Sequence, residues 1–313
     1  LVGSAILKQL NNQGFKNLCF ATHDELDLCD AKQTKAFFER EKPKYVFLCA
    51  AKVGGIIANR DYPVEFIRDN LAIQQNVITC SHEHHVTRLL FLGSSCIYPK
   101  MAPQPMSESD ILTGPLEFTN RPYALAKIAG IEMCSAYNRQ YDTQFLAAMP
   151  TNLYGPNDNY DLQHSHVLPA LIRKCHEAKV NQKEEITLWG TGSPRREFLY
   201  SADLADACVF LMTLPDEKFK VLTSDPESHP LINIGFGSDI TIMELAELIK
   251  SIINFTGDIN WDHSKPDGTP RKLLNSDKLK NLGWTPSTSL KLGVESSYSD
   301  FLKKNESKKK QPA

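Results

Sequence analysis

The stretch Leu89-Leu-Phe-Leu-Gly-Ser-Ser-Cys96 decides the fold of this chain. Its apolar part, Leu89–Gly93, is typical of a buried strand in a parallel sheet, and two serines follow where that strand ends. Tyr123-Ala-Leu-Ala-Lys127 lies downstream. On a helix of about 3.6 residues per turn, Tyr123 and Lys127 are one turn apart on the same face.

This combination indicates carbonyl reduction. An ammonium beside the phenol favours the phenolate, so we expect the pKa of Tyr123 to lie below its ordinary value of about 10. Such a tyrosine can donate a proton to a carbonyl that is being reduced, and a serine hydroxyl at the end of a strand can polarise that carbonyl. The Tyr-x-x-x-Lys spacing alone also fits a half-buried helix face. The strand and the serines in front of it favour a reductase site.

Strands and helices alternate along the first half of the chain. The predicted strands are Leu18–Thr22, Tyr45–Ala51, Leu89–Gly93 and Gln144–Pro150, and the predicted helices are Leu1–Asn12, Thr34–Arg40, Val64–Glu83 and Pro122–Tyr141. This order predicts an α/β fold with a doubly wound parallel sheet of the Rossmann type. Ligands of such sheets bind at the carboxyl ends of the strands.

The alternation weakens after Tyr154-Gly-Pro156, where proline and glycine become denser. Helices are expected at Val167–Ala178 and Thr241–Ile253, the latter opened by a capping box, with a short strand at Ile186–Trp189. We therefore expect a Rossmann domain over residues 1–155 and a smaller C-terminal α/β substrate lobe over 156–302. Some segments of that lobe should return to the Rossmann sheet. Residues 303–313 are expected to form a polar, frayed tail.

The chain opens with Leu1 rather than methionine, and its first ten residues already have the pattern of an amphipathic helix. No basic stretch precedes an apolar core, as it would in a signal peptide. We expect the first strand of the sheet to be missing from this sequence.

Composition narrows the class of protein. A net charge of -2 argues against a nucleic-acid surface. The eight cysteines are scattered without a Cys-x-x-Cys pair, which favours a reducing compartment over a disulfide framework or a zinc site. No apolar run approaches the roughly 20 residues of a membrane helix. We predict a cytoplasmic protein that binds neither membrane nor nucleic acid.

Three motifs resemble the extended short-chain dehydrogenase/reductases: Gly93–Pro99, Tyr123–Gly130 and Met149–Pro156. Four further motifs narrow the match within that superfamily: Ala50–Gly55, Ser165–Pro169, Trp189–Phe198 and Lys265–Lys272. They resemble those of enzymes that epimerise and reduce GDP-4-keto-6-deoxy-D-mannose. The resemblance runs from Leu1 to about Leu302. It implies a GDP-sugar substrate, GDP-L-fucose as product, NADP(H) as cofactor, and a homodimer formed through helices of the cofactor domain.

The resemblance also implies catalytic roles. Ser94 would polarise the carbonyl, Tyr123 would donate the proton, and Lys127 would tune Tyr123 and hold the nicotinamide ribose. Cys96 would be the base that removes protons at C3 and C5, although a free cysteine is more often a small core residue. Strand alternation predicts that Cys96 and Ser94 point to the same side.

His166 would return the proton on the opposite face of the sugar ring, whereas without the resemblance it fits a polar helix cap. The nearby pair His164 and His166 has no acidic or cysteine partner at ligand spacing, so no metal is expected.

The cofactor site departs from the family in two places. Of the glycine-rich phosphate loop, only the last glycine, Gly3, is present. Bacterial relatives place a basic residue where this chain has His23, which would hold a 2′-phosphate only weakly or when protonated. The other implied cofactor contacts are Ala50, Ala51, Leu92, Gly93, Ser94, Ser95, Tyr123, Lys127, Pro150, Thr151, Asn152, Leu153 and His166.

Four further residues match positions that hold the GDP-sugar: Lys174, Trp189, Arg196 and Asp267. Arginine suits a pyrophosphate through its paired N–H donors. Without the resemblance, Trp189 would be assigned to core packing.

Two other classes stay open. A 4-epimerase or 4,6-dehydratase shares this fold, but a dehydratase is expected to carry Thr-Asp-Glu or a similar acid–base pair where this chain has Ser94-Ser-Cys96. A non-catalytic dinucleotide-sensing protein typically loses the tyrosine or the lysine, and this chain has both Tyr123 and Lys127.

Overall fold

The structure is a computed structural model that describes residues 1–162, 165–265 and 267–310. Its central sheet is parallel, in the order β1 (Tyr45–Leu48), β2 (Arg88–Leu92), β3 (Phe145–Pro150) and β7 (Leu231–Ile234). Every residue of β2, β3 and β7 is buried, as expected of strands with helices on both faces. The predicted α/β fold with a parallel sheet is confirmed.

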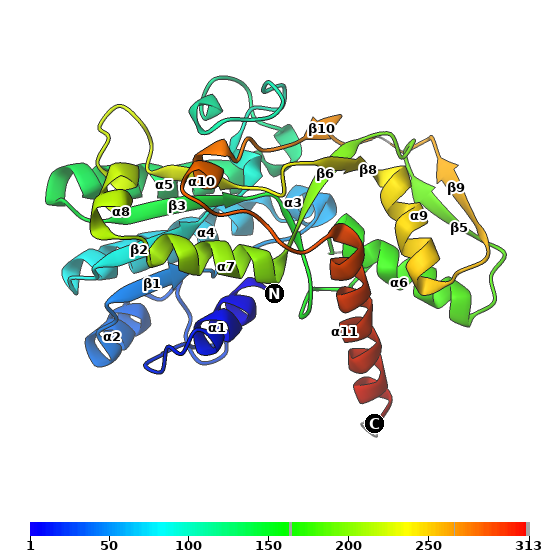
Figure 1. Cartoon of the computed structure of the whole chain (residues 1–313), viewed down its shortest axis with the longest axis horizontal. Coiled ribbons are helices and arrows are strands. Elements are labelled where there is room, and N and C mark those ends of the chain that lie inside the picture. The colour runs from blue at the N-terminus through cyan, green and yellow to red at the C-terminus, as the bar shows by residue number, and fades with distance from the viewer. Residues whose placement is uncertain (163–164, 266, 311–313) are drawn as a thin grey trace.

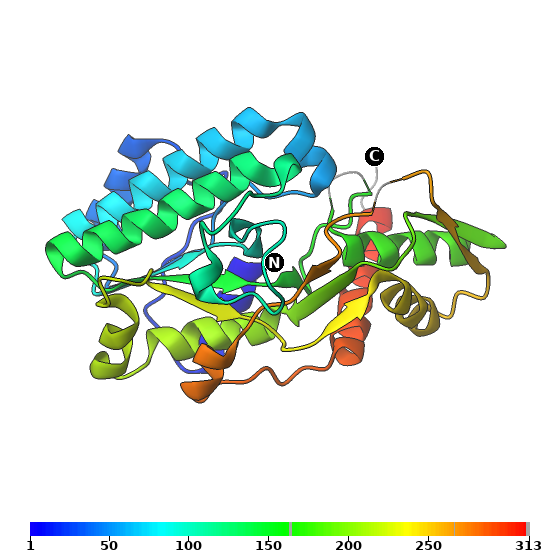
Figure 2. The same ribbon diagram turned by 90° about the horizontal axis from the view of Figure 1, so that it is seen from above.

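Helices cover both faces of this sheet (Figures 1 and 2). One face packs against α2 (Ala31–Glu41), α4 (Pro63–Glu83) and α5 (Arg121–Tyr141). The other face packs against α1 (Val2–Asn12), α7 (Ser201–Met212), α8 (Asp216–Thr223) and α10 (Asp277–Asn281). Side chains of β2 alternate between the two cores, with Leu89 and Phe91 in the first and Leu90 and Leu92 in the second.

A second group of elements follows β3. The strand β6 (Arg195–Tyr200) pairs in parallel with β4 (Asn152–Tyr154) and β10 (Arg271–Lys272), and antiparallel with β8 (Asp239–Thr241). Strand β5 (Glu185–Trp189) pairs in parallel with β9 (Asp258–Asp262). A third core lies among these strands and three helices, α6 (Val167–Val180), α9 (Ile242–Ile253) and α11 (Leu290–Lys310). Four short elements complete the described part of the chain: α3 (Ile56–Asp61), η1 (Ser95–Ile97), η2 (Glu108–Asp110) and η3 (Phe118–Asn120).

The capping box predicted for α9 is present. The Thr241 hydroxyl accepts from the Glu244 amide at 3.1 Å, and the Glu244 carboxylate accepts from the Thr241 amide at 2.8 Å. Two orphan amides of the first turn are thereby satisfied, which fixes where α9 begins.

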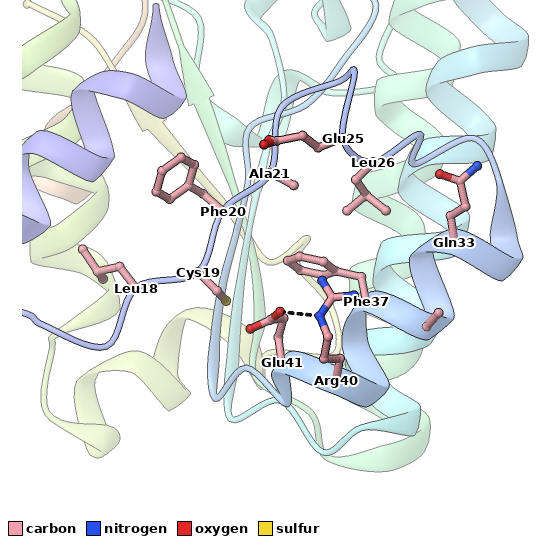
Figure 3. A pocket seen from close by; sticks show the side chains of 11 residues that line it. Leu18, Cys19, Phe20, Ala21, Glu25, Leu26, Gln33, Phe37, Arg40 and Glu41 are labelled. Atoms are coloured by element: carbon pink, nitrogen blue, oxygen red, sulfur yellow. Dashed lines mark hydrogen bonds and ion pairs between the residues drawn. The ribbon is translucent and has the colours of Figure 1, made fainter.

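The predicted strand Leu18–Thr22 is wrong: these residues pair with no strand in the described part of the chain. A β-branched and aromatic composition favours a strand only where a neighbour supplies the ladder, because the strand has no hydrogen bonds of its own. Instead the segment borders a cavity of about 570 Å³ shared with α2 (Figure 3). Phe20 is 67% exposed there.

All eight cysteines are free thiols. Among the described residues, no helix has the length and apolar character needed to cross a membrane.

Candidate active site

The site is built where β2 ends and α5 begins. Ser94 follows β2 in an extended conformation and caps the one-turn helix η1. Helix α5 starts at Arg121, with Pro122 in its first turn, a position that proline favours because its missing N–H would be unsatisfied there. Tyr123 and Lys127 occupy the first two turns of α5, and both are buried. The predicted helical spacing of this pair is confirmed.

Tyr123 is held in a small pocket of protein. Its ring meets Phe66 edge to face at 6.1 Å between centroids, and its hydroxyl is hydrogen-bonded to the side chain of Ser94. Burial raises the pKa of Tyr123 well above its ordinary value, the neighbouring Cys96 thiol adds to the rise, and the Ser94 hydrogen bond opposes it. At neutral pH the phenol therefore keeps its proton, the form that a proton donor needs.

Lys127 lies beneath Tyr123 and is 3% exposed. Its Nζ atom donates to the Leu92 carbonyl at 2.7 Å and lies 4.7 Å from the centroid of the Phe91 ring. Burial lowers the pKa of Lys127 to about 7, with the Cys49 thiol acting in the opposite direction. Since no carboxylate faces the ammonium among the described residues, desolvation dominates.

The expected downward shift of the Tyr123 pKa is thus wrong for the protein without ligands. The sequence argument counted the attraction between ammonium and phenolate but not the cost of removing both groups from water. Burial disfavours the charged form of each side chain, and it is the largest cause of both pKa shifts.

Cys96 does not continue the strand, so the alternation argument for its direction was wrong. The backbone turns into η1, and the Cys96 amide donates to Ser94 Oγ at 3.4 Å. The sulfur nevertheless reaches the site: Asn120 Nδ2 donates to Cys96 Sγ at 3.2 Å, and Lys272 Nζ lies 3.9 Å from it. Ser94, Cys96 and Tyr123 are therefore close together.

Arg196 on β6 extends the site toward the C-terminal elements. Burial lowers the pKa of Arg196, whereas the charges of Asp267 and Cys96 both raise it. Its Nη1 atom donates to the Thr269 carbonyl at 2.6 Å. Asp267 is exposed and accepts from Thr191 N at 2.9 Å and Thr191 Oγ1 at 2.7 Å. Hydrogen bonds from Thr191 hold the pKa of Asp267 below its ordinary range.

Trp189 and Lys174 also belong to the C-terminal elements, at the end of β5 and on α6. Trp189 is 59% exposed, which excludes core packing, and Lys265 Nζ lies 5.8 Å from its ring centroid. Lys174, on α6, is half-buried, and burial lowers its pKa.

The residues that follow β3 are hydrogen-bonded to β6. Pro150 ends β3, and Leu153 belongs to β4. Thr151 Oγ1 and Asn152 Nδ2 both donate to the Glu197 carbonyl oxygen, at 3.1 and 2.8 Å. The buried Glu197 carboxylate accepts in turn from the amides of Gly237 and Leu274. Sequence analysis missed Glu197, although a carboxylate inside the otherwise apolar end of a strand, Glu197-Phe-Leu, was a visible signal.

The remaining cofactor candidates cluster around the ends of β1 and β2. Leu92 and Ser95 are buried, and a Cβ on Gly93 would lie 1.8 Å from Met149 Cε, so a larger residue there would require the Met149 side chain to move. Ala50 and Ala51 follow β1, the neighbouring strand. A Cβ on Gly3, in α1, would meet the side chain of Cys49 at 3.9 Å, which places Gly3 beside the end of β1.

Two candidates remain, His166 and His23. His166 caps α6; its side chain reaches solvent, but the protein around it lowers its pKa by desolvation. His23 lies in an exposed turn, and within the described residues no hydrogen bond or ion pair joins it to another candidate. Gln163 and His164 lie outside the described residues.

The hydrogen-bond donors of Lys127 indicate whether this site can hold a nicotinamide dinucleotide. An ammonium has three donors, and among the described residues the Leu92 carbonyl takes one of them. The other two can serve ribose hydroxyls, and the residues after β1 and β2 include Gly93, Ala50 and Ala51, which are small enough for a cofactor to pass closely. The donor set therefore fits the cofactor.

Comparisons with known proteins show the family of this chain. A family model described as "NAD dependent epimerase/dehydratase family" matches residues 1–235. The chain is 57% identical to GDP-L-fucose synthase 1 of Arabidopsis thaliana, over 97% of this chain and 90% of that protein. It is 50% identical to GDP-L-fucose synthase of Escherichia coli strain K12, over 96% and 94%. A GDP-mannoheptose C4 reductase from Campylobacter jejuni, solved with NADP bound, superposes with a TM-score of 0.87 at 38% identity, over 96% and 95%.

Proposed function

This chain belongs to the NAD dependent epimerase/dehydratase family, and we propose that it is a GDP-L-fucose synthase that converts GDP-4-keto-6-deoxy-D-mannose into GDP-L-fucose. The observation that carries the proposal is that side chains suited to two different reactions lie close together. The Ser94–Tyr123 pair is suited to carbonyl reduction, and the Cys96 thiol beside it is suited to proton transfer at carbon.

Reduction uses the pair at the start of α5. The substrate's C4 carbonyl oxygen accepts hydrogen bonds from Ser94 and Tyr123, which stabilise the negative charge that develops on it. A nicotinamide cofactor, when bound, would supply the hydride. Tyr123 gives its proton to that oxygen, and the buried Lys127 holds the ribose and stabilises the phenolate left behind.

Epimerisation uses the same polarised carbonyl. The ketone acidifies the C–H bonds at C3 and C5, so the Cys96 thiolate can remove a proton and leave an enolate whose oxygen is held by Ser94 and Tyr123. His166 returns a proton to the opposite face of the ring, and its lowered pKa makes the protonated ring a stronger acid. Cys96 and His166 re-equilibrate with solvent between the two centres.

The GDP part of the substrate meets the C-terminal elements. Arg196 supplies paired N–H donors to the pyrophosphate, Lys174 a point charge, Trp189 an exposed ring for stacking, and Asp267 a carboxylate acceptor. The chain thereby divides into a cofactor domain over residues 1–155 and a mainly substrate-binding lobe over 156–302.

The cofactor is NADP(H). His23 stands at the sequence position where bacterial relatives place the basic residue that holds the 2′-phosphate. The enzyme works as a homodimer through helices of the cofactor domain, and a monomer mass in sedimentation equilibrium would contradict this. Eight free thiols suit a reducing compartment such as the cytoplasm.

Product identification tests the function. The protein is incubated with GDP-4-keto-6-deoxy-D-mannose and either NADPH or NADH, and the nucleotide sugar is identified by NMR. We expect GDP-L-fucose, formed faster with NADPH. An unepimerised GDP-6-deoxyhexose would reduce the assignment to a C4 reductase, and no turnover with either cofactor would overturn it.

A further inference from the structure

The Cys96 sulfur has two donors from separate parts of the chain. Asn120, at the end of η3, places Nδ2 3.2 Å from Sγ, and Lys272, at the end of β10, places Nζ 3.9 Å away. Both side chains present N–H groups, and neither can accept the thiol proton through those atoms. Donors of this kind stabilise the thiolate more than the thiol.

The other groups around Cys96 add to this bias. The Arg196 guanidinium is close enough for its charge to interact with the thiolate, while Tyr123, from α5, stays protonated and neutral. Ser94 accepts from the Cys96 amide. None of these neighbours is a carboxylate, so the charged groups facing the sulfur are cations.

Asn120 has a feature that an ordinary structural amide lacks. Its Oδ1 atom is buried and has no hydrogen-bond partner within the described residues. Buried amide oxygens are nearly always paired, so holding the side chain in this orientation costs stability. The hydrogen bond that this orientation does make is the one to the sulfur.

We propose that Asn120 and Lys272 are positioning residues that hold Cys96 as a thiolate aimed into the site, ready to act as the base for epimerisation. This proposal rests on the proposed function. It adds Lys272, which is 176 positions from Cys96 in sequence, to the residues that serve the reaction. It also gives a reason for β10 to pair with β6 beside Arg196.

Alkylation of Cys96 tests the proposal without substrate or cofactor. The rate of iodoacetamide addition to the Cys96 peptide is followed by mass spectrometry from pH 5 to 10, with N-acetylcysteine in the same tube as reference. In the unmodified protein, the midpoint of the curve of alkylation rate against pH should lie at a lower pH for Cys96 than for N-acetylcysteine. A midpoint at or above the reference would overturn the proposal, and no substitution is needed for this arm.

Variants separate the two donors. In Lys272→Gln we expect the midpoint to rise by about one pH unit, and alkylation at pH 7 to slow about tenfold. Lys272→Arg should restore most of the rate. Asn120→Asp, which replaces a donor with a negative acceptor of the same shape, should raise the midpoint further.

The matched control is Arg271→Gln, which removes a cation from the same strand that pairs with Asp239 instead of Cys96. A shift in Arg271→Gln equal to that in Lys272→Gln would show a loss of β10 structure and overturn the proposal, as would unchanged midpoints in both Lys272→Gln and Asn120→Asp. If the protein makes no GDP-L-fucose but the alkylation profiles behave as predicted, only the proposed function has failed.

Discussion

Replacing Lys127 with methionine should make the protein more stable at neutral pH while abolishing ketone reduction. Methionine fills a similar volume without a charge. Burial lowers the pKa of Lys127 from 10.5 to about 7. At pH 7 this displacement corresponds to a cost of roughly 4 kcal/mol for holding the lysine inside the protein. Losing the bond to the Leu92 carbonyl costs about 1.5–3 kcal/mol. The net gain in the free energy of unfolding is therefore about 2 kcal/mol.

The gain should vanish at high pH. Between pH 7 and 10.5 the unfolded chain binds more protons at this lysine than the native protein does, so wild-type stability rises with pH across that window. By pH 10 the cost of burying Lys127 falls to about 1 kcal/mol, which the lost hydrogen bond offsets. Urea unfolding at pH 7 and pH 10 measures both values, with Lys32→Met, an exposed lysine, as the control expected to change neither. A Lys127→Met protein less stable than wild type at pH 7, or a stability difference that is the same at both pH values, would refute the reasoning.

Three further predictions concern the division of labour in the site. Tyr123→Phe should abolish reduction but keep a slower solvent deuterium exchange into the substrate, measured by mass spectrometry, because Cys96 carries the exchange and Ser94 still holds the enolate oxygen; loss of both activities together would contradict separate roles. Cys96→Ser should bind NADPH normally in a fluorescence titration while epimerisation falls roughly 10²- to 10⁴-fold, and near-normal GDP-L-fucose output would exclude this thiol as the base. If His23 meets the 2′-phosphate, His23→Ala should lower the preference for NADPH over NADH, measured as the ratio of the two kcat/KM values; an unchanged ratio in the variant would remove His23 from the cofactor site.

The sequence predicted those elements of the fold whose formation depends on residues that are close together in the chain. The buried strand β2, the α5 helix with Tyr123 and Lys127 on one face, and the Thr241 capping box all follow from periodicity and from residues a few positions apart. The strand predicted at 18–22 failed because a strand depends on a partner that its own sequence does not contain.

The electrostatics of the site could not be predicted in the same way. Whether Lys127 lowers the pKa of Tyr123 depends on how deeply both are buried, and burial is a property of the whole fold. The donors at Cys96 come from positions 24 and 176 residues away, so neither Asn120 nor Lys272 stood out in the sequence, although Lys272 ends a motif used for the family match. Sequence reasoning named the thiol, and the fold supplies its surroundings.

The most direct test of a single site with two chemistries is the reaction in D₂O. GDP-4-keto-6-deoxy-D-mannose is converted with unlabelled NADPH, and NMR locates deuterium in the product. Because proton exchange at C3 and C5 uses solvent while the hydride at C4 comes from the cofactor, we expect GDP-L-fucose with deuterium at C3 and C5 and protium at C4. A product with protium at all three carbons, or one that keeps the D-manno configuration at C3 and C5, would contradict the account.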